Sequence, residues 1–299
     1  MTRSTSPIGF IGLGNMGLPM AQQLQRAGHS LCVCDLNPIA VEELVREGAT
    51  GMATARAVAD ACEIVFLCLL TTASIKEVTT GPAGIIHGKS AHLIVNTSTV
   101  GRPAVLELER ELRRSGMDLV DCPISGGPPG ARRGNLSVMV SGDPEQVRQV
   151  VDLVSCWGSV TVVGAEPGLA QVVKLTNNIL SAVALVATAE AFVAAGKAGL
   201  DLKLLTGAVN AGSGRNSMTL DKIPKSVYDR SFSYGAPIDT LMKDVELAIV
   251  QGESLGVSME VCKMAREALL RVVQAGWGRR DITDFFRFME KDAQFEFSG

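Results

Sequence analysis

The sequence predicts an α/β N-terminal half that a long helix joins to an all-α C-terminal half. Three observations predict this organisation. Short apolar strands alternate with helical stretches as far as Gly164, which is typical of a parallel sheet covered by helices on both faces. A glycine-rich turn directly follows the first strand. After Gly164 only helical periodicity continues, and we expect no strand there.

The elements follow from the spacing of apolar residues and from the turn residues between them. The long helix starts after Pro-Gly and ends near two glycines, Gly196 and Gly199. We therefore divide the chain into domains at residues 1–165 and 166–299. Strands are predicted at 8–13, 31–34, 64–70, 93–96, 118–122, 137–140 and 160–163. Helices are predicted at 16–27, 37–47, 102–115, 167–198, 202–209, 237–255, 259–274 and 283–291.

Composition favours a soluble globular protein. The apolar share of 46% is typical of such proteins, and we expect no 18-residue stretch to be apolar enough to span a bilayer. The longest apolar run, at 182–195, contains Thr188 and Glu190, which favours a buried helix. Residues 1–7 lack the zones of a secretory signal, so we expect a disordered leader and a cytoplasmic protein.

The seven cysteines contain no Cys-x-x-Cys pair. Cys32 and Cys34 share one face of a predicted strand, whereas Cys62 and Cys68 flank an apolar run. This scatter is typical of small buried side chains in a reducing compartment, and it predicts neither a disulfide framework nor a metal site. The net charge of −3 and the lack of Lys/Arg runs argue against nucleic acid or a membrane as partner.

A G-x-G-x-x-G pattern follows the first strand and opens the first helix, within a βαβ unit. Its first glycine allows a tight turn, its second a close approach of the backbone to pyrophosphate, and its third close packing of helix on strand. The helix N-terminus favours phosphate binding. The pattern predicts a Rossmann-type dinucleotide site, with a turn of purely structural use as the alternative. Its residues are Gly12, Leu13, Gly14, Asn15, Met16 and Gly17.

Asp35 follows the second predicted strand. A carboxylate at this place accepts hydrogen bonds from the ribose hydroxyls of NAD and repels the 2′-phosphate of NADP. We therefore expect NAD as the cofactor. The alternative is an ordinary turn residue, since aspartate is common at strand ends.

Hydride transfer to a carbonyl needs a proton donor, and elimination leaves a lysine. His29 lies in a helix–strand turn and His92 just before a strand, and His87 is the third histidine. Neither Tyr228 nor Tyr234 is followed by lysine four residues later, as in the Tyr-x-x-x-Lys pair of short-chain reductases. No His/Cys cluster supports a metal-assisted transfer.

Lys174 is the candidate, on the predicted long helix. Lys174 and Asn178 are four residues apart, so both project from one helical face. The apolar neighbours Val172, Val173 and Leu175 favour partial desolvation of the ammonium, which lowers its pKa toward useful acid–base values. The alternative is a solvated lysine on an amphipathic helix.

A serine and two glycines end another predicted strand, in the segment 121–131 (Asp-Cys-Pro-Ile-Ser-Gly-Gly-Pro-Pro-Gly-Ala). Ser125, Gly126 and Gly127 are expected to form a nest of backbone N–H groups suited to a carboxylate. The alternative is a glycine- and proline-rich turn without a ligand.

These segments together resemble the β-hydroxyacid dehydrogenase family, which includes 3-hydroxyisobutyrate dehydrogenase and tartronate semialdehyde reductase. The matching stretches are 9–21, 121–136, 168–178 and 243–248. The resemblance implies that Lys174 is the catalytic lysine and Asn178 its partner. It implies that Ser125, Gly126 and Gly127 hold the substrate carboxylate.

The resemblance also implies further contacts. Lys243 is expected to close over the nicotinamide, with Asp244 beside it as a substrate contact. Cofactor contacts are expected at Leu69, Leu70, Ser74 and Thr99. The family usually has Asp where Asn96 stands and often Pro where Leu70 stands, which affects the local cofactor contacts.

The segment 210–217 occupies the region that varies with substrate in this family. Arg215 is expected either to grip an acidic substrate group or to cap a helix or pair with Asp221. Glu190 matches a family glutamate and is interpreted as a structural, hydrogen-bonded group.

The expected activity is NAD-dependent oxidation of a 3-hydroxyacid, or reduction of its semialdehyde, with a small carboxylate as the substrate. Members of the family pair through the all-α domain, so we expect a homodimer or homotetramer. The alternatives are an imine reductase of the same architecture, which generally lacks the lysine, and a non-catalytic nucleotide-binding scaffold.

Overall fold

The first half of the chain builds one sheet, which sets the edge where the glycine loop lies. A computed structural model describes residues 6–297, in two compact units, Met1–Lys174 and Leu175–Gly299. Residues 1–5, where most of the expected leader falls, and residues 298–299 lie outside the described part. The boundary expected from sequence, between 165 and 166, precedes the long helix and stays a prediction.

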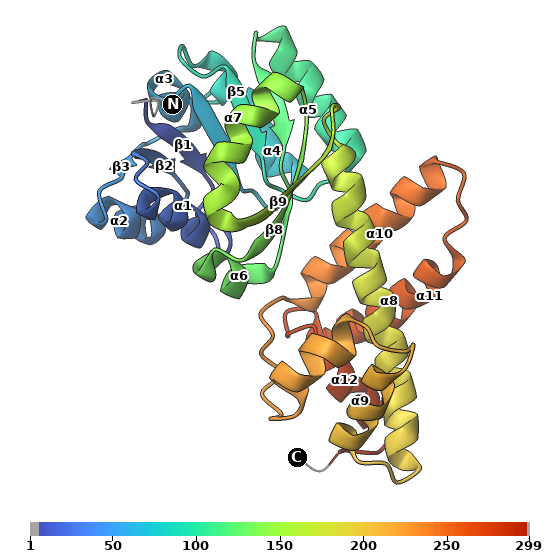
Figure 1. Cartoon of the computed structure of the whole chain (residues 1–299). Helices are drawn as coiled ribbons and strands as arrows, with labels where there is room; N and C mark the ends of the chain where they lie inside the picture. The colour runs from blue at the N-terminus through green and yellow to red at the C-terminus, as the bar shows by residue number, and fades with distance from the viewer. Residues whose placement is uncertain (1–5, 298–299) are drawn as a thin grey trace. The chain divides into compact units, whose positions relative to one another are not determined.

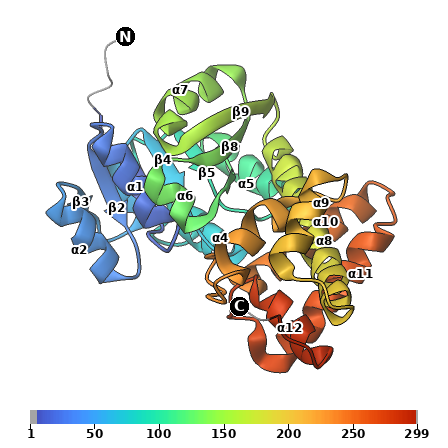
Figure 2. The ribbon, with the colours of Figure 1, turned by 60° about the horizontal axis from the view of Figure 1, so that its bottom comes forward.

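The strands of the first unit run β3-β2-β1-β4-β5-β6-β8-β7, and β9 pairs with β8 (Figures 1 and 2). The order reverses at β1, which pairs with β2 on one side and β4 on the other. Ligands of such sheets bind outside the carboxyl ends of the strands at this reversal. The strands are β1 Ile8–Ile11, β2 Leu31–Cys34, β3 Thr50–Gly51, β4 Ile64–Leu67, β5 Leu93–Asn96, β6 Asp118–Asp121, β7 Ile124–Ser125, β8 Leu136–Ser141 and β9 Gly158–Gly164.

The expectation of a wholly parallel sheet is wrong for its far end. The strands from β3 to β6 are parallel, but β8 is antiparallel to both β6 and β7. The short helix α6 (Gly127–Arg133) alone connects β7 to β8. Parallel pairing needs a crossover of a dozen residues or more, so the chain turns back instead.

Helices cover both faces of this sheet, as predicted. The strand side chains alternate: Phe10 and Phe66 pack with Trp157 on one face, whereas Ile11 and Leu67 face the other. The first face is covered by α1 (Gly17–Arg26), α2 (Pro38–Arg46) and α7 (Pro144–Val154). The second is covered by α3 (Ala55–Ala61), α4 (Thr72–Thr80) and α5 (Arg102–Arg114).

Four of these helices, α3, α4, α6 and α7, were not predicted. Side-chain caps mark the N-termini of three of them, α3, α4 and α7. Thr54 caps α3, Thr71 and Ser74 form a capping box at α4, and Asp143 accepts from the first backbone N–H groups of α7.

The second unit is helical, and in its described residues the strand pairing is limited to one isolated bridge, Pro237 with Asp281. A π-helical segment at Met218–Val227 was missed, because Pro224 inside it interrupts the sequence pattern. The helices are α8 Leu169–Lys197, which begins in the first unit, α9 Leu202–Ala211, α10 Ile238–Ser254, α11 Glu260–Val272 and α12 Asp284–Asp292, with a short π-helical turn at Val273–Trp277.

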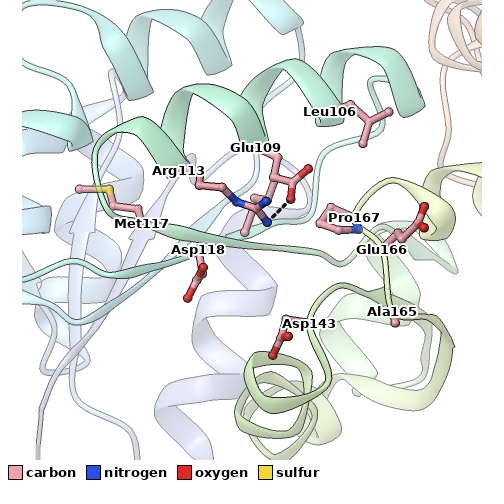
Figure 3. A pocket seen from close by; sticks show the side chains of 10 residues that line it. Leu106, Glu109, Arg113, Met117, Asp118, Asp143, Ala165, Glu166 and Pro167 are labelled. Atoms are coloured by element: carbon pink, nitrogen blue, oxygen red, sulfur yellow. Dashed lines mark hydrogen bonds and ion pairs between the residues drawn. The ribbon is translucent and has the colours of Figure 1, made fainter.

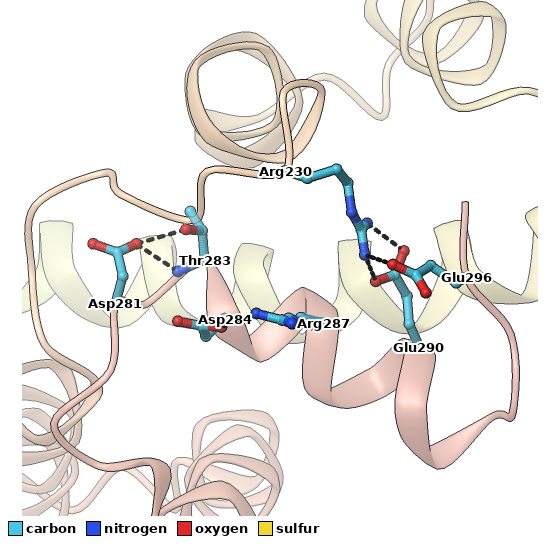
Figure 4. Close-up of polar contacts among 7 residues, drawn as sticks. All are labelled: Arg230, Asp281, Thr283, Asp284, Arg287, Glu290 and Glu296. Atoms are coloured by element: carbon cyan, nitrogen blue, oxygen red, sulfur yellow. Dashed lines mark hydrogen bonds and ion pairs between the residues drawn. The ribbon is translucent and has the colours of Figure 1, made fainter. Parts of the chain in front are cut away.

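A buried ion pair ties the loop after the π-helical segment to α12. The guanidinium of Arg230 donates to both carboxylate oxygens of Glu290, at 2.7 Å each, and reaches Glu296 at 2.8 Å (Figure 4). Glu290 is only 2% exposed, so this bidentate geometry compensates the cost of burying its charge.

The expectation that no stretch is apolar enough to span a bilayer is wrong for α8. An 18-residue window of this helix has a mean hydropathy of 1.9, and half of it is buried inside the protein. Core helices of globular proteins pass the same test by length and composition. Leu185 and Phe192 of α8 lie in the core of the second unit, in agreement with the predicted buried helix.

The seven cysteines all carry free thiols. Cys32, Cys62 and Cys122 are buried, and Cys32 and Cys62 belong to the apolar core around α3. Desolvation raises the pKa of the Cys122 thiol, which keeps it protonated. The interpretation as small buried side chains is confirmed for these three residues.

Trp157 offers a test of the first core. Its ring is fully buried, and its indole N–H donates to the backbone oxygen of Met20 at 3.0 Å. We expect Trp157→Ala to lower the free energy of unfolding of the first unit by about 3–5 kcal/mol, because it opens a large cavity. Hydrogen exchange of the β1 and β4 amides measures this. Trp277→Ala, in the second unit, should leave the exchange rates of those amides unchanged. Equal effects of the two variants would contradict the assignment of Trp157 to a separate core of the first unit.

Candidate cofactor and substrate sites

The glycine loop combines two glycines that the fold requires with one that it does not. Gly12 has φ of +97°, and a Cβ there would lie 2.3 Å from the carbonyl oxygen of Cys68. A Cβ at Gly17 would lie 1.8 Å from the carbonyl oxygen of Gly12. A Cβ at Gly14 would meet nothing within 4 Å. The open space beside Gly14 fits the close approach of a pyrophosphate.

Asp35 links the second strand to this loop. Its Oδ2 accepts the backbone N–H of Leu13 at 2.5 Å, and its Oδ1 accepts that of Asn37 at 2.7 Å. The bond to Asn37 is the turn contact of the alternative interpretation, whereas the bond to Leu13 reaches across to the glycine loop. A carboxylate has about four lone-pair positions, so acceptor capacity remains for ribose hydroxyls.

Other predicted cofactor residues follow β4 and β5. The backbone N–H of Leu69 donates to the Ser98 hydroxyl at 2.8 Å, and Leu70 is 70% exposed. The Ser74 hydroxyl donates to the Thr71 carbonyl at 2.9 Å in the capping box of α4. This capping bond gives Ser74 a structural function of its own. Thr99 is half-buried after β5.

Asn96 is fully buried at the end of β5. Its amide nitrogen donates to the Ser98 carbonyl and to Asp121 Oδ1, both at 3.2 Å, and its oxygen accepts the Ser98 N–H. The side chain therefore holds the 96–98 turn to the end of β6. Sequence reasoning connected Asn96 with cofactor contacts and missed this link to Asp121.

Asp121 is a buried carboxyl that sequence reasoning did not single out. Gln171 donates to it twice, from its side-chain amide to Oδ1 at 2.8 Å and from its backbone N–H to Oδ2 at 3.1 Å. Burial raises the pKa of Asp121 to about 7, against the hydrogen bonds of Gln171, Asn96 and the Gly168 backbone, which lower it. The segment 121–131 was considered only for its Ser-Gly-Gly turn. No signal in the sequence distinguishes Asp121 from any other strand residue.

The Ser-Gly-Gly segment ends β7, as expected for a strand-end nest. Gly126 and Gly127 have φ of +128° and +64°, a conformation that favours glycine at both positions. Ser125 is half-buried, and Gly126 is exposed and precedes the first residue of α6. A partly exposed turn of this conformation is suited to binding a small carboxylate through its backbone N–H groups.

Lys174 and Asn178 lie one turn apart on α8. Lys174 is only 8% exposed, so the alternative of a solvated surface lysine is wrong. Asn178 donates its amide N–H to Asp244 Oδ2 at 2.6 Å. Asp244 Oδ1 lies 3.2 Å from the ammonium of Lys243, the residue before it on α10. Three residues that the resemblance grouped, Asn178, Lys243 and Asp244, are therefore brought together.

Two residues behave differently from expectation. Arg215 is exposed, and Asp221 pairs with Lys225 and accepts the Tyr234 hydroxyl, so the alternative that Arg215 pairs with Asp221 is wrong. Glu190 lies on an exposed part of α8 and has no hydrogen bond within residues 6–297. Its interpretation as a structural, hydrogen-bonded group is wrong within the described residues, because the side chain is exposed and has no partner among them.

Lys222 was missed because it lies in the unpredicted π-helical segment. It is 5% exposed, and its ammonium donates to the hydroxyls of Ser181 and Ser217 at 3.1 and 3.0 Å. Desolvation lowers its pKa, against the opposing charge of Asp221.

Two sequence profiles and several known proteins match this chain. The profile of the NAD binding domain of 6-phosphogluconate dehydrogenase matches residues 7–164. The profile described as the NAD-binding domain of NADP-dependent 3-hydroxyisobutyrate dehydrogenase matches residues 168–289. The 2-hydroxy-3-oxopropionate reductase of Escherichia coli (strain K12) is 36% identical over 288 residues, which cover 95% of this chain and 97% of that protein.

Mitochondrial 3-hydroxyisobutyrate dehydrogenase of Bos taurus is 31% identical over 300 residues, which cover 98% of this chain and 89% of the relative. The chain belongs to the β-hydroxyacid dehydrogenase family. The solved structure of Mycobacterium tuberculosis 3-hydroxyisobutyrate dehydrogenase with L-serine has a TM-score of 0.87 at 26% identity, covering 95% of this chain and 99% of that one. This β-hydroxyacid dehydrogenase therefore has the Rossmann-type and all-helical parts predicted from sequence, and it is a hydroxyacid oxidoreductase with NAD(P)-binding domains.

A cavity in the first unit of this family member shares none of the predicted site residues. It lies beside α5 and the start of β6, and it is lined by Glu109, Arg113, Asp118, Asp143 and Glu166 among others (Figure 3). Glu109 pairs with Arg113 there at 2.6 Å. The strands reach the glycine loop at their carboxyl ends, whereas Asp118 is the first residue of β6. The cavity is therefore no part of the candidate cofactor site.

The glycine loop gives a matched pair of variants. Gly14→Ala should keep the melting temperature within about 2 °C, because its Cβ meets open space, yet weaken NADH binding about tenfold or more. Gly17→Ala should lower the melting temperature by more than about 4 °C, because its Cβ collides with the Gly12 carbonyl. NADH fluorescence titration and thermal unfolding measure the two effects. Unweakened NADH binding by Gly14→Ala would show that the pyrophosphate lies elsewhere.

Proposed function

We propose that the protein is an NAD-dependent 3-hydroxyacid dehydrogenase in which Lys174 is the general acid–base. One observation carries the proposal: Lys174 is buried on a helix whose first turn hydrogen-bonds Asp121, four residues before Ser125. The lysine and the Ser-Gly-Gly turn are therefore anchored at one point of the first unit. A buried amine on a helix anchored to the strand that leads into a carboxylate-binding turn is suited to proton exchange on a small hydroxyacid.

In this mechanism the turn at Ser125, Gly126 and Gly127 binds the substrate carboxylate through its hydroxyl and backbone N–H groups. The bound nicotinamide supplies hydride acceptance in one direction and hydride donation in the other. The neutral amine of Lys174 accepts the proton of the substrate hydroxyl during oxidation. Its ammonium returns a proton to the carbonyl oxygen during reduction. Asn178, one turn further on, is proposed to orient the lysine or the substrate.

Asp35 supports NAD as the preferred cofactor. Its carboxylate already accepts from the glycine loop, which fixes a negative charge at the end of β2. That charge disfavours a 2′-phosphate. The profile that matches the second half is described for an NADP-dependent enzyme, so the preference must be measured.

The proposed substrates carry a hydroxyl on the carbon β to a carboxylate. This chemistry is common to hydroxyisobutyrate, which is in the name of the bovine protein, and to L-serine, which is present in the mycobacterial structure. Exposed Arg215 is a candidate contact for a second acidic group, because a guanidinium pairs bidentately with carboxylates.

The assembly is proposed to be a homodimer or homotetramer in the cytoplasm. Large apolar side chains of the second unit are exposed, among them Leu180 and Leu204, each 66% exposed. Burial of such side chains against a second copy favours association.

Lys174→Ala should lower kcat by about 10²- to 10⁴-fold while NADH still binds, because the proton acceptor is lost. Lys197→Ala, at the other end of the same helix, is the matched control and should keep kcat. The assay follows NADH absorbance with a panel of 3-hydroxyacids. A near-normal kcat for Lys174→Ala would refute the lysine assignment, and turnover of imines but of no hydroxyacid would favour the imine reductase alternative.

Asp35→Asn should lower the NAD-to-NADP ratio of kcat/KM about tenfold or more. The amide removes the charge that repels the 2′-phosphate, while its oxygen can still accept one backbone N–H. Steady-state kinetics with both cofactors measure the ratio. An unchanged ratio would mean that Asp35 is a turn residue without a part in cofactor choice.

A further inference from the structure

The first turn of α8 is fixed by hydrogen bonds to other elements of the first unit. The first N–H groups of a helix have no partner within the helix. Here the N–H of Ala170 donates to the Ser141 hydroxyl at 2.9 Å, and the N–H of Gln171 donates to Asp121 Oδ2 at 3.1 Å. Ser141 and Asp121 are paired across the antiparallel strands β8 and β6. The helix therefore starts on a defined pair of strand ends.

The side chain of Gln171 adds a second set of bonds to the same place. Its oxygen accepts the backbone N–H groups of Val100 and Gly101 at 3.0 and 3.1 Å. Its nitrogen donates to the Ser98 carbonyl at 3.0 Å and to Asp121 Oδ1 at 2.8 Å. All of these groups are buried. Gln171 thus joins the turn after β5 to the end of β6.

In the described part of the chain, the side-chain oxygens of Asp121 accept hydrogen bonds from donors on two other elements. Gln171 and Asn96 donate to it, and it lies at the N-terminal end of α8, where a negative charge is favoured by the helix dipole. A carboxylate accepts hydrogen bonds at both of its oxygens. An asparagine in its place would put an NH₂ group where one oxygen now accepts, and that group would face other N–H donors. Burial opposes the charge and raises the pKa of Asp121 to about 7.

Lys174 is three residues after Gln171, about 4.5 Å further along the helix axis. A shift of the first turn therefore moves the lysine. We propose that Asp121 is a positioning residue, which sets the start of α8 and through it the place of the Lys174 amine. This inference rests on the proposed function of Lys174. Asp121 touches neither substrate nor cofactor in this proposal, and it acts through the helix.

The test is Asp121→Asn, with Asp118→Asn as the matched control. Asp118 begins the same strand, is exposed and accepts only from the Gln146 side chain in the described part of the chain. We expect Asp121→Asn to lower kcat about 10- to 100-fold, because a misplacement near 1 Å costs about this much. KM for the hydroxyacid and the NADH dissociation constant should change less than about threefold. The control should match the unmodified protein in all three quantities.

A second variant keeps the proposal testable where Asp121→Asn does not fold. Gln171→Met removes the side-chain bonds but leaves the backbone N–H that donates to Asp121. It should lower kcat by a smaller factor, again with little change in KM. An unchanged kcat in both variants would overturn the proposal. Rises in KM and in the NADH dissociation constant as large as the loss of kcat would also overturn it, because they indicate general distortion.

Lys174→Ala separates the failure of this inference from the failure of the proposed function. If Lys174→Ala loses turnover while Asp121→Asn keeps it, the lysine acts as proposed and Asp121 does not position it. If Lys174→Ala keeps turnover, the proposed function fails first, and any loss in Asp121→Asn cannot pass through the lysine.

Discussion

The carboxylate of Asp121 joins three segments that are far apart in the chain. It accepts from Asn96 at the end of β5 and from Gln171 in the first turn of α8, while it ends β6 itself. A buried charge is retained only where hydrogen bonds compensate its desolvation. The sheet edge that carries the Ser-Gly-Gly turn and the helix that carries Lys174 thus depend on one buried, hydrogen-bonded carboxyl group. A small change in its hydrogen bonds is therefore expected to displace both the Ser-Gly-Gly turn and Lys174, the two proposed parts of the substrate site.

The glycine loop depends on local contacts, and the function of each of its three glycines was predictable from their spacing. Gly12 and Gly17 are required because a side chain would collide with backbone, which agrees with the tight turn and the close packing expected of them. Gly14 has no internal reason to be glycine. A position that the fold leaves free, within a loop that the fold fixes, is best explained by a ligand at close range. Periodicity and local glycine chemistry were sufficient for this inference.

The missed features are those that depend on long-range contacts. Nothing local distinguishes Asp121 from a strand aspartate, because its partners Asn96 and Gln171 lie far away in sequence. The short strand β7 was missed, and the reversed direction of the predicted strand β8 was missed because a strand pattern does not carry direction. An ion pair with Asp221 was one of the alternatives for Arg215, yet Asp221 pairs within its own helical turn with Lys225. Pairing preferences of surface charges are weak and depend on geometry that spacing does not supply.

Asp35 shows why two interpretations of one residue need not compete. One interpretation made Asp35 an ordinary turn residue at a strand end, and the other made it an acceptor for the ribose hydroxyls of NAD. The carboxylate bonds both Asn37 and Leu13, so the same charge that would select NAD also holds the loop that would bind its pyrophosphate. Cofactor choice and loop geometry are therefore coupled through one side chain. A substitution that admits a 2′-phosphate must replace the bond to Leu13, or the loop relaxes and both cofactors bind more weakly.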